Sequence, residues 1–82
     1  MNQMFKYKDG SEIMVRDFVL FDGGSSPGTV EFMVTSAEEM KETRVEEPGV
    51  MLDVIPLGLV YLPLSSLLED PLRFVSRGHK TL

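Results

Sequence analysis

The 82-residue sequence contains no cysteine, no tryptophan and only one histidine, His79. Without cysteine the chain can form no disulfide, and it offers neither a thiolate nucleophile nor a thiolate ligand for zinc. One histidine near the end of the sequence does not supply the three or four converging ligands of a metal site, nor the partnered base of a nucleophilic enzyme. We therefore expect a protein that is not an enzyme and that holds no metal and no cofactor.

Long apolar segments are also missing. The longest uncharged stretch, residues 54–68, has 15 residues and is interrupted by Pro56, Gly58 and Pro63. A membrane-spanning helix needs about 20 apolar residues. The first twenty residues carry six charged side chains and no apolar run typical of a signal peptide. These absences predict a cytoplasmic protein with no membrane segment.

Positive charge is scarce in the middle of the chain. Residues 21–53 carry eight acidic and two basic side chains, a balance of −6, and the whole chain has a net charge of −5. Nucleic-acid binding draws much of its affinity from basic groups that neutralise phosphates. The charge layout therefore disfavours nucleic acid as a partner. It leaves only a small basic patch as a source of phosphate contacts: Lys6, Lys8, Arg73, Arg77 and Lys80.

Apolar and polar residues alternate through most of the sequence, which is typical of half-buried strands. The alternation covers residues 5–8, 13–16, 29–34, 50–54, 59–62 and 72–74, and residues 18–21 form a short continuous apolar run. The parity of these strands predicts that Val30, Phe32, Leu52, Tyr61 and Phe74 are mostly buried. We expect one small β-domain over residues 1–77, followed by a flexible tail at residues 78–82.

Two helical segments interrupt this pattern. Ser36 and Glu39 have the spacing of a capping box, in which each side chain accepts a backbone N–H from the other residue. The box predicts a helical insertion over residues 36–44, ended by the turn signal Pro48-Gly49. Residues 65–71 predict a helical turn just before the last strand.

The glycine-rich residues 22–28 and the apolar residues 54–59 each have two interpretations. A phosphate-binding loop needs a lysine and a following helix, and residues 22–28 have neither, so a hairpin loop is the better interpretation. Residues 54–59 form either part of the core or an exposed turn at Pro56 that belongs to an interface, for example of a homodimer. The core interpretation is favoured.

The segment from Val15 to Phe21, followed by Pro27-Gly28-Thr29-Val30-Glu31, resembles the SH3-like barrel in the form found in KOW domains. The sequence departs from that pattern at Arg16, where the family usually has glycine, and it lacks the basic and aromatic loop residues that bind nucleic acid. The resemblance implies an all-β, mainly antiparallel, SH3-like small barrel with one short helical insertion. It also leaves a nucleic-acid or ribonucleoprotein accessory domain as the alternative function.

The densest group of charged side chains is the acidic segment, which we define as Glu38, Glu39, Glu42, Glu46 and Glu47. It lacks the alternating ligands and central glycine of a Ca²⁺ loop. It is either a solvated helix and turn or a surface that attracts a basic protein. In size, acidity and lack of cysteine the chain is similar to bacterial immunity proteins, which neutralise toxins. We therefore expect a non-enzymatic protein-binding domain whose partner is a basic protein, such as a toxin.

Overall fold

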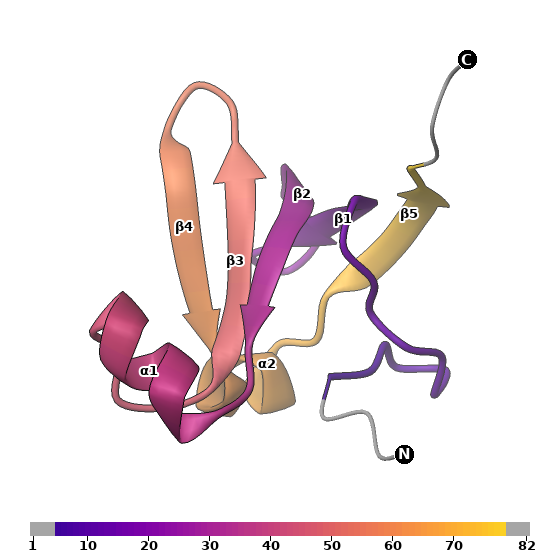
Figure 1. Cartoon of the computed structure of the whole chain (residues 1–82). Coiled ribbons are helices and arrows are strands. Elements are labelled where there is room, and N and C mark those ends of the chain that lie inside the picture. Colours follow the sequence, from indigo (N-terminus) through magenta and orange to yellow (C-terminus); the bar gives the residue numbers. More distant parts are fainter. Residues whose placement is uncertain (1–4, 79–82) are drawn as a thin grey trace.

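The computed structural model describes residues 5–78 and contains a five-stranded antiparallel sheet with two short helices (Figure 1). The elements are β1 (Asp17–Phe21), β2 (Ser26–Val34), α1 (Ala37–Thr43), β3 (Gly49–Val54), β4 (Gly58–Pro63), α2 (Leu64–Glu69) and β5 (Arg73–Arg77). The strand order is β4-β3-β2-β1-β5. The last strand therefore pairs with the first, and the expected β-rich, mainly antiparallel class is confirmed.

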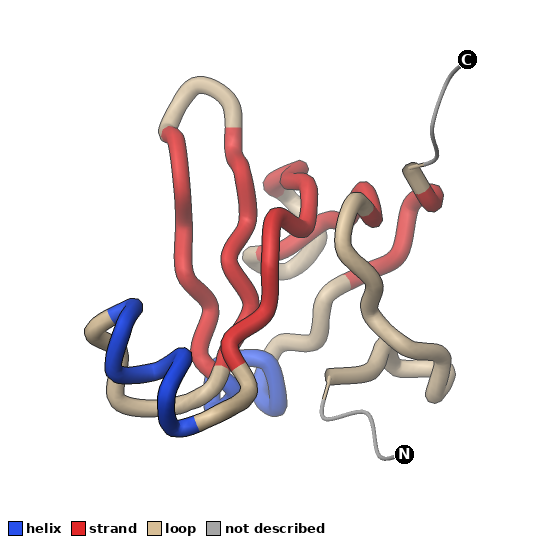
Figure 2. The backbone as a smooth tube through the Cα atoms, in the orientation of Figure 1, coloured by secondary structure: helices blue, strands red, loops and turns tan. Residues whose placement is uncertain are grey.

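The sheet is strongly twisted, so that β1 and β5 run across the direction of β3 and β4 (Figure 2). Two irregularities in register accompany the twist. Glu31 is an extra residue in β2 opposite β3, and Val75 is an extra residue in β5 opposite β1. Such bulges bend a strand and increase its twist, which wraps the sheet around the inner face that carries the core.

The core combines the inner face of the sheet with the segment that precedes β1. Val30 and Leu52 are fully buried on the inner face, as the sequence predicted. Phe5, Tyr7 and Ile13 join them from the N-terminal segment. The alternation at residues 5–8 and 13–16 therefore identified Phe5, Tyr7 and Ile13 correctly, but it placed Val15 on the same face as Ile13, and Val15 is exposed. In the structure this segment forms only an isolated bridge between Lys6 and Glu12 instead of two strands.

Three of the side chains predicted to be buried are more accessible than expected. Phe32 is 38% exposed and Phe74 is 47% exposed, while Tyr61 is half-buried. The bulge at Glu31 explains Phe32, because the shifted register pairs it with Met51, on the face opposite the core. Phe74 lies on an edge strand, where its ring contacts Tyr7 at 5.3 Å between centroids but is not covered by another strand.

The expected capping box at the start of α1 is confirmed. The Ser36 hydroxyl accepts the Glu39 N–H at 3.1 Å, and the Glu39 carboxylate accepts the N–H groups of Ser36 and Thr35 at 3.1 and 2.9 Å. Arg44 ends the helix in a left-handed conformation with φ 64°. α1 contributes no buried residue, whereas the helical turn predicted before the last strand is α2, whose Leu67 belongs to the core.

Candidate protein-binding surfaces

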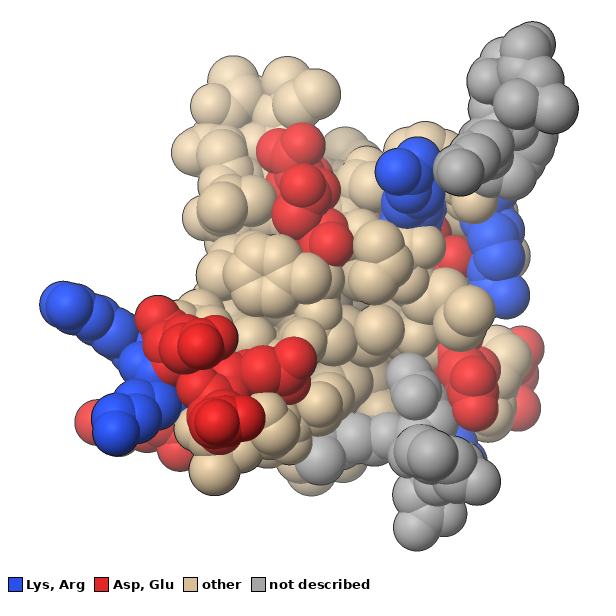
Figure 3. Space-filling model, viewed as in Figure 1, with Lys and Arg blue, Asp and Glu red and all other residues tan. Residues whose placement is uncertain are grey.

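The acidic segment lies on α1 and on the turn that follows it. Glu38, Glu42 and Glu46 are exposed, and within residues 5–78 none of them forms an ion pair. Figure 3 shows acidic side chains gathered over α1, with the basic side chains of the same region pointing to its outer side. Three of the five predicted residues therefore present carboxylates to solvent on one part of the surface.

The other two glutamates of the acidic segment have structural partners. Hydrogen bonds from the backbone N–H groups of Thr35 and Ser36 lower the pKa of Glu39 below its usual value. One carboxylate oxygen of Glu47 accepts the N–H of Ser65 at 2.9 Å, and the backbone carbonyl of Glu47 accepts the Tyr61 hydroxyl at 2.7 Å. Glu39 and Glu47 thus hold the start of α1 and the turn after it in place. Glu38, Glu42 and Glu46 remain as the candidate residues for contact with a partner protein.

A second surface is apolar and lies on the outer face of the sheet. A cleft of about 270 Å³ there is lined by Phe18, Leu20, Pro27, Ile55 and Val75 together with Asp53. Phe18 is 46% exposed and Val75 is 54% exposed. These side chains come from β1, β2, β5 and the end of β3, so the cleft spans four neighbouring elements.

The apolar tip of the β3–β4 hairpin borders this cleft. Ile55 is 87% exposed, Leu57 76% and Leu59 60%. The favoured core interpretation of residues 54–59 is therefore wrong for all but Val54, which is buried. The tip projects beyond the body of the sheet in Figure 1, and Gly58 closes the turn at φ +100°, a conformation that other residues rarely adopt.

A buried polar group that the sequence did not reveal lies between β1, β5 and the N-terminal segment. The Asp17 carboxylate is fully buried and accepts hydrogen bonds from the Tyr7 hydroxyl (2.5 Å), the Met14 N–H (3.0 Å) and the Arg77 guanidinium (2.8 and 3.2 Å). Arg77 also lies over the ring of Phe74. Asp17 follows a turn, where an aspartate is ordinarily exposed, so the local sequence gave no sign of its burial.

These contacts set the ionisation of Asp17 and Tyr7. Burial acts to raise the pKa of Asp17, but the hydrogen bonds from Arg77, Tyr7 and Met14 outweigh it and hold this pKa below its usual value. Burial and the adjacent carboxylate raise the pKa of Tyr7 well above its usual range. Asp17 is therefore a charged acceptor with satisfied partners, which makes it a structural anchor between three segments.

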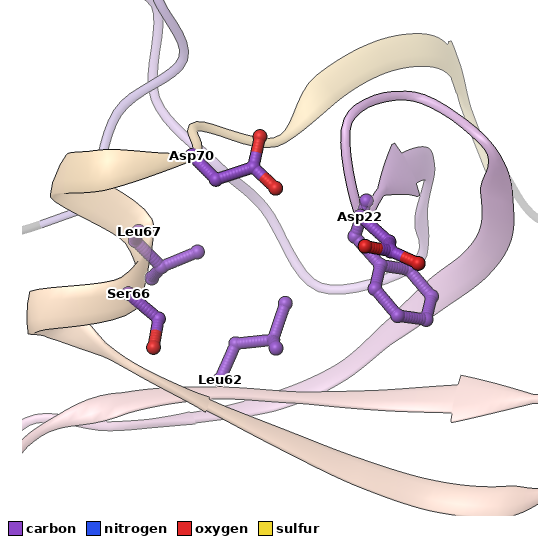
Figure 4. A pocket seen from close by; sticks show the side chains of 6 residues that line it. Asp22, Leu62, Ser66, Leu67 and Asp70 are labelled. Atoms are coloured by element: carbon purple, nitrogen blue, oxygen red, sulfur yellow. The ribbon is translucent and has the colours of Figure 1, made fainter.

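A hollow of about 250 Å³ opens between α2, β4 and the β1–β2 turn (Figure 4). Leu62 and Leu67 form its floor, while Asp22, Ser66 and Asp70 stand around it. Asp70 accepts the N–H of Gly23 at 2.9 Å, which ties the turn to α2. Within residues 5–78 no three acidic or histidine side chains are grouped to hold a metal ion, and His79 lies outside the described residues.

The chain matches no family model, and no curated protein or solved structure is significantly similar to it. Within the described residues, neither helix has the length and apolar character to cross a membrane. The candidate surfaces therefore rest on the chemistry of this chain alone.

Proposed function

We propose that the protein is a non-enzymatic protein-binding domain that uses the exposed carboxylates of the acidic segment to capture a basic protein. The observation that carries the proposal is the construction of α1. This helix has a complete capping box and a fixed C-terminal turn, yet it adds no buried residue to the core. Its sequence maintains a defined helix that the core does not require, as expected of a recognition element.

The charge of this surface supports the same function. Glu38 and Glu42 are four residues apart and share one face of α1, and Glu46 continues the negative field beyond it. Their carboxylates are free of ion pairs within residues 5–78, so no internal partner must be displaced on binding. A negative surface of this kind attracts a basic partner and raises its association rate, with a strong dependence on salt.

As the finer form of the fold we propose an SH3-like barrel. The support is the strand order β4-β3-β2-β1-β5, with the last strand beside the first and the short helix α2 immediately before it. The biological form that we propose for the binding activity is the neutralisation of a basic toxin by an immunity-type inhibitor. Its support is the combination of small size, net negative charge and an acidic helix that is capped at both ends.

The test compares two variants with the same change in net charge. Glu38→Lys with Glu42→Lys reverses the face of α1, and Glu31→Lys with Glu69→Lys reverses two exposed glutamates elsewhere. Each protein is immobilised and used to capture proteins from a cell extract at low and moderate salt. We expect wild type and the control to retain the same basic protein, and the α1 variant to lose it.

The same proteins are tested in mobility-shift assays with RNA and DNA. The nucleic-acid alternative predicts that both lysine variants bind better than wild type, because each adds positive charge. A wild-type protein that shifts nucleic acid at moderate salt and retains no protein would refute the protein-binding proposal. Equal loss of the partner in both variants would show that net charge, and not α1, is responsible.

A further inference from the structure

The apolar cleft on the outer face of the sheet is built from two rows of residues that cross the strands. Directly paired residues of antiparallel strands point to the same face. The first row is therefore Asp53 on β3, Thr29 on β2, Phe18 on β1 and Ser76 on β5. The second row contains Pro27 on β2, Leu20 on β1 and Arg73 on β5. Ile55, in the turn that follows β3, also lines the cleft.

One acidic and one basic residue stand at diagonally opposite corners of these two rows. Asp53 begins the first row and Arg73 ends the second. Both side chains are exposed, and within residues 5–78 neither forms an ion pair. Between them lie Phe18 and Leu20, with Val75 on the bulge of the edge strand. The surface is thus apolar at its centre and carries opposite charges at its two ends.

Such a surface is complementary to itself. In a two-fold symmetric contact, residue i of one copy meets residue j of the other, and j meets i. A two-fold axis that crosses the cleft midway between Asp53 and Arg73 places each carboxylate of one copy beside the guanidinium of the other. The same rotation carries the exposed aliphatic tip of each β3–β4 hairpin towards the β1–β5 side of the second copy.

We propose that this outer face is a homodimer interface in which two copies pack their apolar clefts together and exchange two Asp53–Arg73 ion pairs. The interface covers apolar side chains that the monomer leaves open, of which Ile55 and Leu57 are the most exposed. A large apolar surface rimmed by polar groups marks a contact site. The matching of opposite charges identifies a second copy of this chain as the occupant.

The net negative charge of the chain does not oppose this contact. The acidic segment follows the end of β2 at Val34, whereas the cleft lies around Thr29, about 17 Å away along the strand. Figure 1 places α1 at one end of the sheet and the hairpin tip at the other. Repulsion between exposed charges is largely screened beyond about 8 Å at physiological salt. The dimer therefore leaves α1 available for a separate partner.

Sedimentation equilibrium of the purified chain measures the association over about 10 μM to 1 mM, a range that includes weak dimers. We expect wild type to form a dimer in this range. Asp53→Arg and Arg73→Asp should each weaken the dimer about tenfold or more, because symmetry converts two attractive contacts into two repulsive ones. Glu38→Arg makes the same charge change as Asp53→Arg but lies on α1, so it should leave dimerisation intact.

Restoration of binding provides the sharpest test. The double variant Asp53→Arg/Arg73→Asp should recover the wild-type affinity, because each contact again joins opposite charges. An equimolar mixture of the two single variants should form a heterodimer, although each alone dimerises poorly. Only an interface in which these two residues meet across a two-fold axis predicts both recoveries.

A second pair of variants tests the apolar centre. Val75→Asp should abolish the dimer, whereas Val15→Asp, at a side chain that is similarly exposed (47%) but does not line the cleft, should not. Far-UV circular dichroism confirms that each variant is folded. A wild-type protein that stays monomeric at about 1 mM would overturn the proposal. So would a dimer that none of the cleft variants weakens, or a monomer whose cleft captures a different protein.

Discussion

Replacement of Asp17 by alanine should destabilise the protein more than any single change at its surface. The Asp17 carboxylate is fully buried and accepts four hydrogen-bonding contacts from three residues. Alanine removes every acceptor atom and leaves the Tyr7 hydroxyl and the Met14 N–H without their partner. A buried polar group without a hydrogen bond costs about 1–3 kcal/mol. We therefore expect the free energy of unfolding to fall by about 2–6 kcal/mol for these two groups.

This loss is large compared with the stability of a small domain, which is about 5–15 kcal/mol in total. Asp17→Asn keeps the shape of the side chain and one acceptor oxygen, so we expect a smaller loss than for alanine. Urea denaturation followed by far-UV circular dichroism measures both, with Glu69→Ala as the control. Glu69 is exposed, and such a change usually alters stability by about 0.5 kcal/mol or less.

The pH dependence of stability tests the same group in a second way. The pKa of Asp17 is lower in the folded protein than in the unfolded chain. Its stabilising contribution is therefore fully present above the unfolded pKa of about 4, and it is lost as the pH falls through the folded pKa. Wild type and Asp17→Asn should accordingly converge in stability at acidic pH. An Asp17→Ala variant that unfolds at the same urea concentration as Glu69→Ala would refute this account.

Four other expectations concern the alkaline side, the core, the helix cap and a close contact. The pKa of Tyr7 is raised in the folded state. The stabilisation that its protonated hydroxyl provides is therefore present below about pH 10 and is lost as the pH rises above it. Tyr7→Phe should accordingly remove part of the alkaline loss of stability that urea denaturation measures. Leu52→Ala should cost about 2–5 kcal/mol of unfolding free energy and Phe32→Ala clearly less, because only Leu52 is fully buried; equal costs would contradict the outward position of Phe32. Ser36→Ala should lower the free energy of unfolding by about 1 kcal/mol, because it removes the N-cap of α1. Hydrogen exchange should then become faster in α1 only, and a faster exchange throughout the sheet would contradict a local role of the cap. Gly49→Ala should lower the free energy of unfolding by about 1–3 kcal/mol, since the new Cβ would lie 2.6 Å from the Tyr61 ring. Unchanged stability in thermal or urea unfolding would refute this tight packing.

The sequence predicted the elements of the fold better than the faces of its strands. Alternation located β2, β3 and β4, and the Ser36–Glu39 spacing identified α1 together with its cap. The predicted burial of Phe32 was wrong, because the extra residue Glu31 moves the later side chains of β2 to the opposite face of the sheet. A bulge is decided by pairing with a strand twenty residues away, and the local pattern around Glu31 contains no sign of it.

The candidate surfaces show the same limit. The local capping box alone was sufficient to give Glu39 a structural role. Glu47 could not be separated from the exposed glutamates in this way, because its partner Ser65 is 18 residues distant. The outer cleft was missed for a related reason, since Asp53, Phe18 and Val75 meet only after the sheet has formed. Contacts that depend on strand order were therefore beyond what spacing could predict.

The pairing of β1 with β5 has a consequence for how the chain folds while it is being synthesised. β1 is made early, but Arg77, which compensates the charge of Asp17, lies 60 residues later. Until β5 emerges from the ribosome, a nascent chain that closed its core would bury a carboxylate without its cation, which is strongly unfavourable. The early strands should therefore remain open to solvent and to chaperones, and folding should be completed only when β5 has been released.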